Sequence, residues 1–148
     1  MKYIYFDFGG SHSSVLAANI HVGNLNKGQL PSDAELMNLP LFDKNSPDDF
    51  GKMHLIGKDE AGNEVYVLGT RHSNFEPTIR GLATLAGVSQ DFVFTHTMPY
   101  VNIILRIGGF LSRGLSWPVL GRPLVFRGAR IAYPSLVKLV ERTKVLSI

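Results

Sequence analysis

A glycine- and hydroxyl-rich segment near the N-terminus contains the residue types that bind an anion. The segment lies between an apolar run over 3–8 and a helical pattern over 15–21. Its glycines let backbone amides approach a ligand, its hydroxyls donate hydrogen bonds, and a helix N-terminus favours negative charge. We therefore predict that a phosphate group is bound by Gly9, Gly10, Ser11, Ser13 and Ser14.

Three histidines could supply acid–base or nucleophilic chemistry beside that anion. His12 lies in the loop, and His72 and His96 follow two later strand-like runs. An imidazole titrates near neutrality, so these three residues are the predicted catalytic groups for phosphoryl or ester transfer or hydrolysis. Arg71 and Thr95 are predicted to bind the ligand with them, because guanidinium and hydroxyl groups bind oxyanions. The residues converge only if the first and last strands of the sheet are neighbours.

Other roles for the same residues stay open. His12 could hydrogen-bond to the backbone and stiffen the turn, and Asp7 could orient a histidine or act as a buried structural carboxylate. The three histidines with Asp7 could form a zinc site with one open position, although they lack the i, i+4 spacing of such sites. We expect no metal, and the sequence specifies no cofactor.

The loop departs from the two common nucleotide-binding motifs. It has no second glycine at the spacing of G-x-x-x-x-G-K-[ST], no lysine, and no match to G-x-G-x-x-G. ATP or GTP hydrolysis by the usual residues is therefore not indicated. The expected ligand is a phosphorylated small molecule or nucleotide, held by a P-loop-like strand, loop and helix.

The apolar patterns that must position this loop predict an α/β fold. Both faces of the run over 3–8 are apolar, as in a central parallel strand covered by helices. Runs over 53–58 and 64–70 flank a glycine-containing loop, which indicates a β-hairpin. A last strand is expected over 91–98. We predict a single three-layer domain over residues 1–148, with a mostly parallel central sheet and this hairpin.

Helices are expected over 13–22, 32–38, 75–88, 100–115 and from about residue 135. Ser13 or Ser14 is expected to cap the first, and a capping box of Ser32 with Glu35 the second. The connecting segment over 24–50 is expected to contain only surface helices. The pair Gly108-Gly109 predicts a close helix contact or a kink.

Positive charge is concentrated in the last third of the chain. Residues 1–100 contain seven Lys/Arg and eleven Asp/Glu, whereas residues 101–148 contain eight Lys/Arg and one acid. The alternative function is therefore a non-catalytic interaction protein that docks this basic third on an anionic membrane surface or an acidic partner. A nucleic-acid partner is not expected, because interleaved aromatic residues are missing. The arginines behind this alternative are Arg106, Arg113, Arg122, Arg127 and Arg130.

Composition favours a cytoplasmic location. The chain has no cysteine, so it has neither disulfides nor thiolate metal sites. A strand-like run begins at once and no basic-then-apolar leader precedes it. The apolar run over 101–111 is shorter than the 20 or so residues that span a bilayer.

Several segments together resemble a small family of uncharacterised proteins from endospore-forming bacteria, classed as a domain of unknown function. The resemblance implies a compact domain in a bacterial cytoplasm and assigns no activity or catalytic residue. It depends on four stretches: Tyr5 to Ser14, Gly57 to Gly69, Ile107 to Arg113 and Leu120 to Val125.

Overall fold

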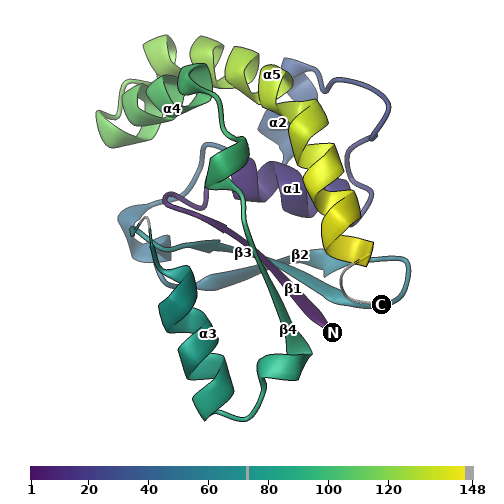
Figure 1. Cartoon of the computed structure of the whole chain (residues 1–148). Coiled ribbons are helices and arrows are strands. Elements are labelled where there is room, and N and C mark those ends of the chain that lie inside the picture. The colour runs from purple at the N-terminus through teal and green to yellow at the C-terminus, as the bar shows by residue number, and fades with distance from the viewer. Residues whose placement is uncertain (73, 146–148) are drawn as a thin grey trace.

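A computed structural model describes residues 1–72 and 74–145, and within them an open four-stranded sheet carries five α-helices (Figure 1). The strand order is β2-β3-β1-β4. β1 (Lys2–Asp7) runs parallel to β3 (Glu64–Gly69) and to β4 (Phe92–His96), and β2 (Met53–Lys58) pairs with β3 in the antiparallel direction. The fold is therefore mixed α/β with a mostly parallel sheet and the expected hairpin.

β1 is a central strand of the sheet, and the later strands are added on both sides of it. Its neighbours are β3 on one side and β4 on the other, so the condition for the predicted site, that the first and last strands are neighbours, is met. Asp7 is level with Gly69, and Phe6 is level with His96. The carboxyl ends of three parallel strands therefore meet at one edge, where open α/β sheets bind their ligands.

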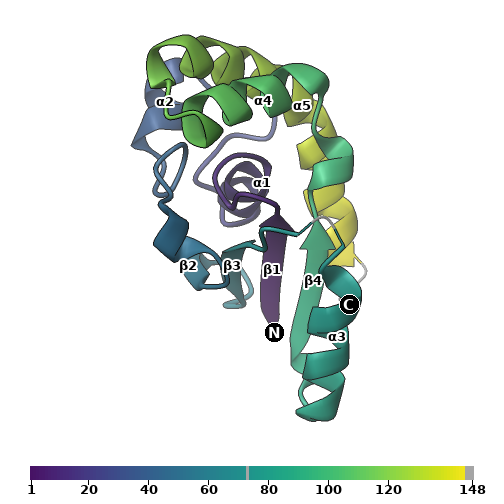
Figure 2. The same cartoon turned by 90° about the vertical axis from the view of Figure 1, so that its left-hand side faces the viewer.

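The alternation of β1 gives the sheet two apolar faces. Tyr3 and Tyr5 face α1 (Ser13–His21), all nine residues of which are buried. Ile4 and Phe6 belong to a second apolar cluster that includes Ala83 of α3 (Glu76–Leu85). Figure 2 shows α1 enclosed between the sheet and the helices above it, which fixes the loop that precedes α1.

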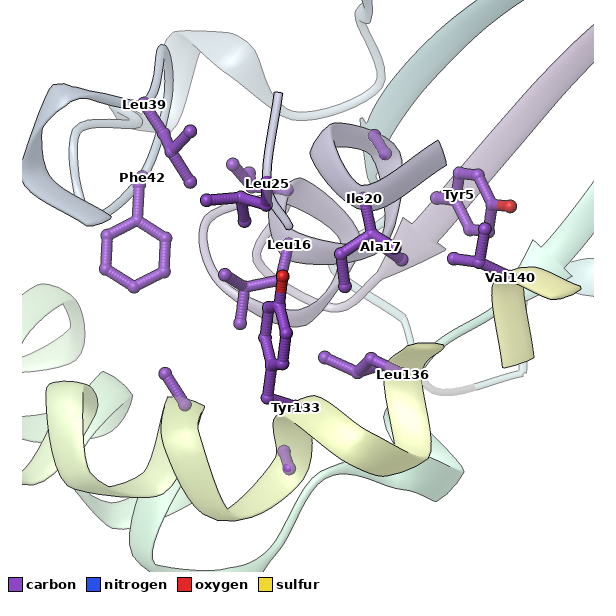
Figure 3. Close-up of a cluster of buried hydrophobic side chains, with 14 of the residues drawn as sticks. Tyr5, Leu16, Ala17, Ile20, Leu25, Leu39, Phe42, Tyr133, Leu136 and Val140 are labelled. Carbon is purple, nitrogen blue, oxygen red and sulfur yellow. The ribbon is translucent and has the colours of Figure 1, made fainter. Parts of the chain in front are cut away.

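The last helix, α5 (Pro118–Val145), begins well before the expected position near residue 135. Pro118 is accommodated in the first turn, but Pro123 and Pro134 lie inside the helix, where proline normally interrupts it. Burial explains the difference: Tyr133, Leu136 and Val140 pack against Leu16 and Ile20 of α1 (Figure 3). Tertiary packing here outweighs the local cost of proline.

The expected helix over 100–115 is divided into two parts, α4 (Ile103–Gly109) and a π-helical turn, η4 (Phe110–Gly114). Of the two explanations expected for the glycine pair, a close helix contact or a kink, the close contact is found at Gly108. A Cβ on Gly108 would lie 2.6 Å from the Val125 amide nitrogen, and one on Gly128 would overlap Leu105. Glycine therefore lets α4 and α5 pack with their backbones almost touching.

The connecting segment over 24–50 is more than the surface segment that we expected. Its helix α2 (Asp33–Asn38) has the predicted capping box, with the Glu35 amide donating to Ser32 Oγ at 3.2 Å. However, Leu36, Leu39 and Phe42 are buried in the main core. Because these residues enter the core, the segment that follows them is held close to the β1–α1 loop.

Short 3-10 turns complete the chain: η1 (Pro47–Asp49), η2 (Ser89–Asp91) and η3 (Met98–Tyr100). None of the helices in the described part of the chain is both long and apolar enough to cross a bilayer.

Candidate functional site

Asp7, the last residue of β1, holds the β1–α1 loop in place. Its buried carboxylate accepts hydrogen bonds from the Gly10 amide, from Ser13 Oγ at 2.7 Å and from the Ser14 amide at 2.9 Å. The expected cap of α1 by Ser13 or Ser14 is therefore wrong, since the N-cap residue is His12 and makes no side-chain cap bond. A carboxylate from the preceding strand caps the helix instead.

Two glycines let this loop pass close to β3. Gly10 has a φ of +65°, and a Cβ on it would lie 2.7 Å from the Gly69 amide nitrogen. A Cβ on Gly69 would in turn lie 2.8 Å from the Gly9 carbonyl oxygen. Ser13 Oγ also lies 2.8 Å from Thr97 Oγ1, just beyond β4. The loop is thus fixed to the ends of both neighbouring strands.

A cavity of about 520 Å³ lies where these strand ends meet. It has contributions from the β1–α1 loop, from the segment after β4, from α4 and η4, and from Phe50. Its size is in the range of small-molecule sites. The lining residues are Asp7, Phe8, Gly9, Ser11, His12, Ser13, Phe50, His96, Met98, Val101, Leu105, Arg106, Gly109, Phe110 and Arg113.

Within the loop, some amides are free to bind a ligand. The Gly10 and Ser14 amides donate to Asp7. For the amides of Ser11, His12 and Ser13, no hydrogen bond to another residue is found within the described ranges, 1–72 and 74–145. All three residues line the cavity, and the first amides of an α-helix have no partner within the helix.

Asp43 orients the imidazole of His12. Asp43 Oδ1 lies 3.1 Å from His12 Nε2, and the carboxylate also accepts hydrogen bonds from Ser112 Oγ at 2.7 Å and from Arg122 Nε at 3.0 Å. Asp43 is buried and has a φ of 53°. Asp43 thus links three parts of the chain in one polar network: the connecting segment over 24–50, the β1–α1 loop, and the α4–α5 hairpin, which consists of α4, η4 and α5.

The protonation of this network follows from the pKa of Asp43. Burial by itself would raise that pKa, but the hydrogen bonds from His12, Ser112 and Arg122 outweigh it and hold the pKa at about 2. An ionised carboxylate can only accept, so Nε2 of His12 must carry a proton. In the neutral imidazole, Nδ1 is then the basic nitrogen. A Cβ on Gly109 would lie 3.0 Å from that atom, which places the Nδ1 edge of the ring beside α4.

The two arginines of the cavity wall differ in their hydrogen-bond partners. Arg113 donates to the backbone carbonyl oxygens of Asp43 and Asn45. The side chain of Arg106 forms no ion pair or hydrogen bond with the residues that the structure describes. Arg106 is therefore a cation at the cavity that has no counter-ion among the described residues.

The structure brings together some of the predicted site residues. His12, His96, Gly9, Ser11 and Ser13 line the cavity. His96 stacks on Phe6 with ring centroids 4.9 Å apart. Gly10 and Ser14, also predicted to bind the ligand, do not line the cavity. The buried Ser14 hydroxyl has no partner among the described residues.

The remaining predicted residues lie elsewhere. His72 is exposed and outside the cavity lining. The Arg71 guanidinium sits over the Phe50 ring, 5.3 Å from its centroid, and Arg71 is not part of the wall either. Thr95 faces Thr143, with 3.3 Å between their hydroxyl oxygens. Arg71 and His72 lie on the turn after β3, whereas Thr95 is inside β4 and alternates with His96, so its side chain is on the opposite face of the sheet.

The zinc alternative required His12, His72, His96 and Asp7 to converge. Within residues 1–72 and 74–145, no group of three or more His, Asp or Glu side chains is close enough to hold a metal ion. The position of His72 and the engagement of Asp7 with the loop explain this.

Asp43 and Ser112 belong to the site although no motif in the sequence indicated them, and Arg106, Arg113 and Arg122 were expected only as members of a basic region. A weak signal was present: Ser112, Arg113 and Arg122 fall in stretches on which the family resemblance depends. Asp43 had no such signal, because it lies in an irregular segment whose path is set by burial of Phe42.

A comparison with protein-family models identifies the family of this chain. The model described as Protein of unknown function (DUF3189) matches residues 2–145. The chain belongs to this family. No curated protein and no solved structure matches the chain. The match confirms the expected kinship with a domain of unknown function, and its span includes the loop, Asp43 and the α4–α5 hairpin of the DUF3189 chain.

Proposed function

We propose that this DUF3189 protein binds a phosphorylated small molecule or nucleotide in the cavity at the ends of β1 and β4. In this proposal, the first strand, loop and helix act as a P-loop-like unit of a three-layer domain, without the lysine of a P-loop. The observation that carries the proposal is the placement of loop residues and an arginine on one cavity wall, at the switch point of the sheet, where the amides of Ser11 to Ser13 and the guanidinium have no partner among the described residues.

The charge of the wall supports an anionic ligand. Arg106 and Arg113 contribute two positive charges, and Asp7 is the acid of the lining. Its carboxylate already accepts hydrogen bonds from Gly10, Ser13 and Ser14, so it is turned toward the loop. A phosphate could therefore accept from the Ser11, His12 and Ser13 amides and pair with Arg106.

Histidine-assisted phosphoryl or ester transfer or hydrolysis is the chemistry that fits the proposed site. Asp43 keeps the proton on Nε2 of His12 and leaves Nδ1 to act as a base. In hydrolysis, a water molecule would give its proton to Nδ1 as its oxygen attacks phosphorus, and the leaving oxygen would depart with the bonding pair. His96, on the same wall, is the second candidate acid or base.

Calorimetric titration and thermal unfolding with inorganic phosphate, sugar phosphates and nucleotides test the binding proposal. A ligand at 100 times its Kd adds about 2.7 kcal/mol to the unfolding free energy. We expect Arg106→Gln to weaken binding about tenfold or more, because it removes an ion pair in a partly enclosed site. We expect Arg127→Gln to leave binding unchanged: Arg127 is also exposed and also in the basic third, but it does not line the cavity.

Hydrolysis of an aryl phosphate ester tests the catalytic part separately. His12→Gln should remove any turnover while leaving phosphate binding within a few-fold of the wild type, since the loop amides remain. Absence of binding by every phosphate compound, or equal binding by the Arg106→Gln variant, would contradict the proposal as a whole. Binding without turnover would contradict only its catalytic part.

A second candidate function is docking of the α4–α5 hairpin on an anionic membrane surface. No acid occurs between Asp91 and Glu141, and the hairpin exposes large apolar side chains. The arginines support this less than their number suggests, because Arg122 pairs with Asp43 and Arg130 with Asp33. The exposed apolar residues are Ile103, Ile107, Phe110, Leu115, Trp117, Val119 and Leu120.

Flotation with vesicles that contain anionic lipid tests this candidate. Binding should fall as salt rises, because exposed charges are screened beyond about 10 Å at 0.1 M. It should also fall in Trp117→Ser but not in Leu85→Ser, which removes an exposed apolar residue of α3. Binding that ignores both salt and the Trp117 substitution would exclude the hairpin as the docking surface.

A bacterial cytoplasmic setting is part of the proposal. The lack of cysteine fits a reducing compartment, and phosphorylated metabolites are abundant there. Fractionation of cells that express a tagged chain would test it.

A further inference from the structure

The cavity wall combines its anion-binding groups with a large apolar surface, which inorganic phosphate alone would not use. We infer that the ligand is a single-chain amphiphile, with a phosphate group attached to an alkyl or similar apolar chain. This inference rests on the proposed function, because the phosphate is placed at the β1–α1 loop and Arg106.

The apolar part of the wall comes from four separate segments of the chain. Its residues are Phe8, Phe50, Met98, Val101, Leu105 and Phe110. Two of these side chains are unusually exposed for phenylalanine, Phe8 at 50% and Phe110 at 61%. Both project from segments that also carry the polar groups, since Phe8 precedes the loop and Phe110 follows Gly109.

Burial of these rings by a ligand explains their position better than core packing does. Phe8 comes directly after β1, the last five residues of which are all buried. Phe110 is the first residue of the π-helical turn and follows Gly109, which lies beside the His12 ring. An exposed apolar patch beside convergent polar groups marks a binding site. Folding leaves these rings in contact with water, so a ligand that covers them gains the favourable free energy of burying apolar surface.

The chemistry of the wall favours an alkyl chain over a sugar or a nucleobase. A sugar ring or a base edge needs hydrogen-bond partners when it leaves water. The six apolar residues have no polar side-chain atom apart from the weakly accepting sulfur of Met98. The polar side chains of the wall lie on the loop, on His96 and on the two arginines; the phosphate is placed at the loop and Arg106, and Arg113 already donates to backbone carbonyls.

A chain-length series of monoalkyl phosphates tests the inference on the full-length protein. Calorimetric titration would compare methyl, butyl, hexyl and octyl phosphate below their aggregation concentrations. A buried methylene is worth about 0.8 kcal/mol, or about fourfold in affinity, and a half-buried one about twofold. We therefore expect affinity to rise about two- to fourfold per methylene from butyl to octyl phosphate.

Two pairs of measurements separate the apolar contact from the phosphate contact. Phe110→Ser should flatten the chain-length dependence and weaken octyl phosphate binding far more than methyl phosphate binding, whereas Leu85→Ser, an 87% exposed residue of α3, should change neither. Phe8→Ser provides an independent check at the other edge of the cavity. 1-Octanol should bind far more weakly than octyl phosphate, because it lacks the charge.

Each outcome decides between the two proposals. Equal affinity along the series, with phosphate binding intact, overturns the amphiphile inference and leaves the proposed function standing. Tighter binding of a nucleoside monophosphate than of octyl phosphate also overturns the inference, in favour of a nucleotide. No binding by any phosphate overturns both, and equal binding of 1-octanol and octyl phosphate overturns the phosphate contact.

Discussion

Replacement of Asp43 by asparagine should destabilise the protein and change how its stability depends on pH. The Asp43 carboxylate contacts His12, Ser112 and Arg122, and its side chain is completely buried. Asparagine has nearly the same size, so the substitution removes charge and one acceptor without opening a cavity. The perturbation therefore isolates the electrostatic contribution of the network.

The expected magnitude follows from the pKa of Asp43. The pKa lies at about 2 in the folded chain, against an ordinary value of 3.8. At about 1.4 kcal/mol per pH unit, this difference corresponds to about 2 to 3 kcal/mol of stability. Since the folded pKa is the lower one, this contribution is fully present above pH 4 or so and is lost as the pH falls toward 2.

Urea unfolding of the wild type and Asp43→Asn at pH 7, 5, 4 and 3 measures this contribution. We expect the variant to be less stable by about 2 kcal/mol or more at pH 7, because buried Ser112 also loses a charged acceptor. The difference in unfolding free energy between the wild type and the variant should become smaller below pH 4. Asp33→Asn is a matched control: Asp33 pairs with Arg130, but its side chain is 59% exposed, so we expect a change below 1 kcal/mol.

A uniform loss of stability at all four pH values would refute this reasoning, since it would mean that size or packing, not ionisation, causes the loss. A loss at pH 7 no larger than that of Asp33→Asn would refute it as well. Asp59, whose pKa is also held at about 2, contributes to the acid dependence of both proteins. The comparison of variant with wild type cancels that contribution.

Three further substitutions, and one control, test other parts of the structure. Gly128→Ala should cost 2 kcal/mol or more in urea unfolding, because its Cβ would overlap Leu105, whereas Gly81→Ala, which has open space, should add up to about 1 kcal/mol. The wild type should lose about 3 kcal/mol of unfolding free energy through His21 as the pH falls from 6.5 to 4, and His21→Gln should not show this decrease. Burial lowers the pKa of His21 to about 4, so its contribution is present above pH 6.5 and is lost below. Asp7→Ala should lower both the stability and the affinity for phosphate, because the loop loses its acceptor; unchanged phosphate binding would contradict our description of the loop.

Local patterns in the sequence determine much of the sheet. Alternation and β-branched residues place the strands within a residue or two, and the capping box of α2 forms as its residue spacing requires. These features depend on neighbours along the chain, which is why residue order suffices to predict them. The glycine pair 108–109 also implied close helix packing, because glycine is otherwise costly inside a helix.

The path of residues 39–45 and the course of α5 depend on distant contacts. Phe42 is buried by packing against residues far from it in the sequence, and this brings Asp43 beside His12. The prolines of α5 argue locally against a helix, and only its burial against α1 overrides them. Neither effect has a local signature.

The sequence by itself determined the loop that starts the site: two glycines, three serines and a histidine after a buried strand. Only the tertiary structure decided which residues share that site, because the ends of parallel strands and the α4–α5 hairpin meet through packing between distant segments. That packing includes His96 and Arg106, excludes His72, and supplies the carboxylate that fixes the proton of His12.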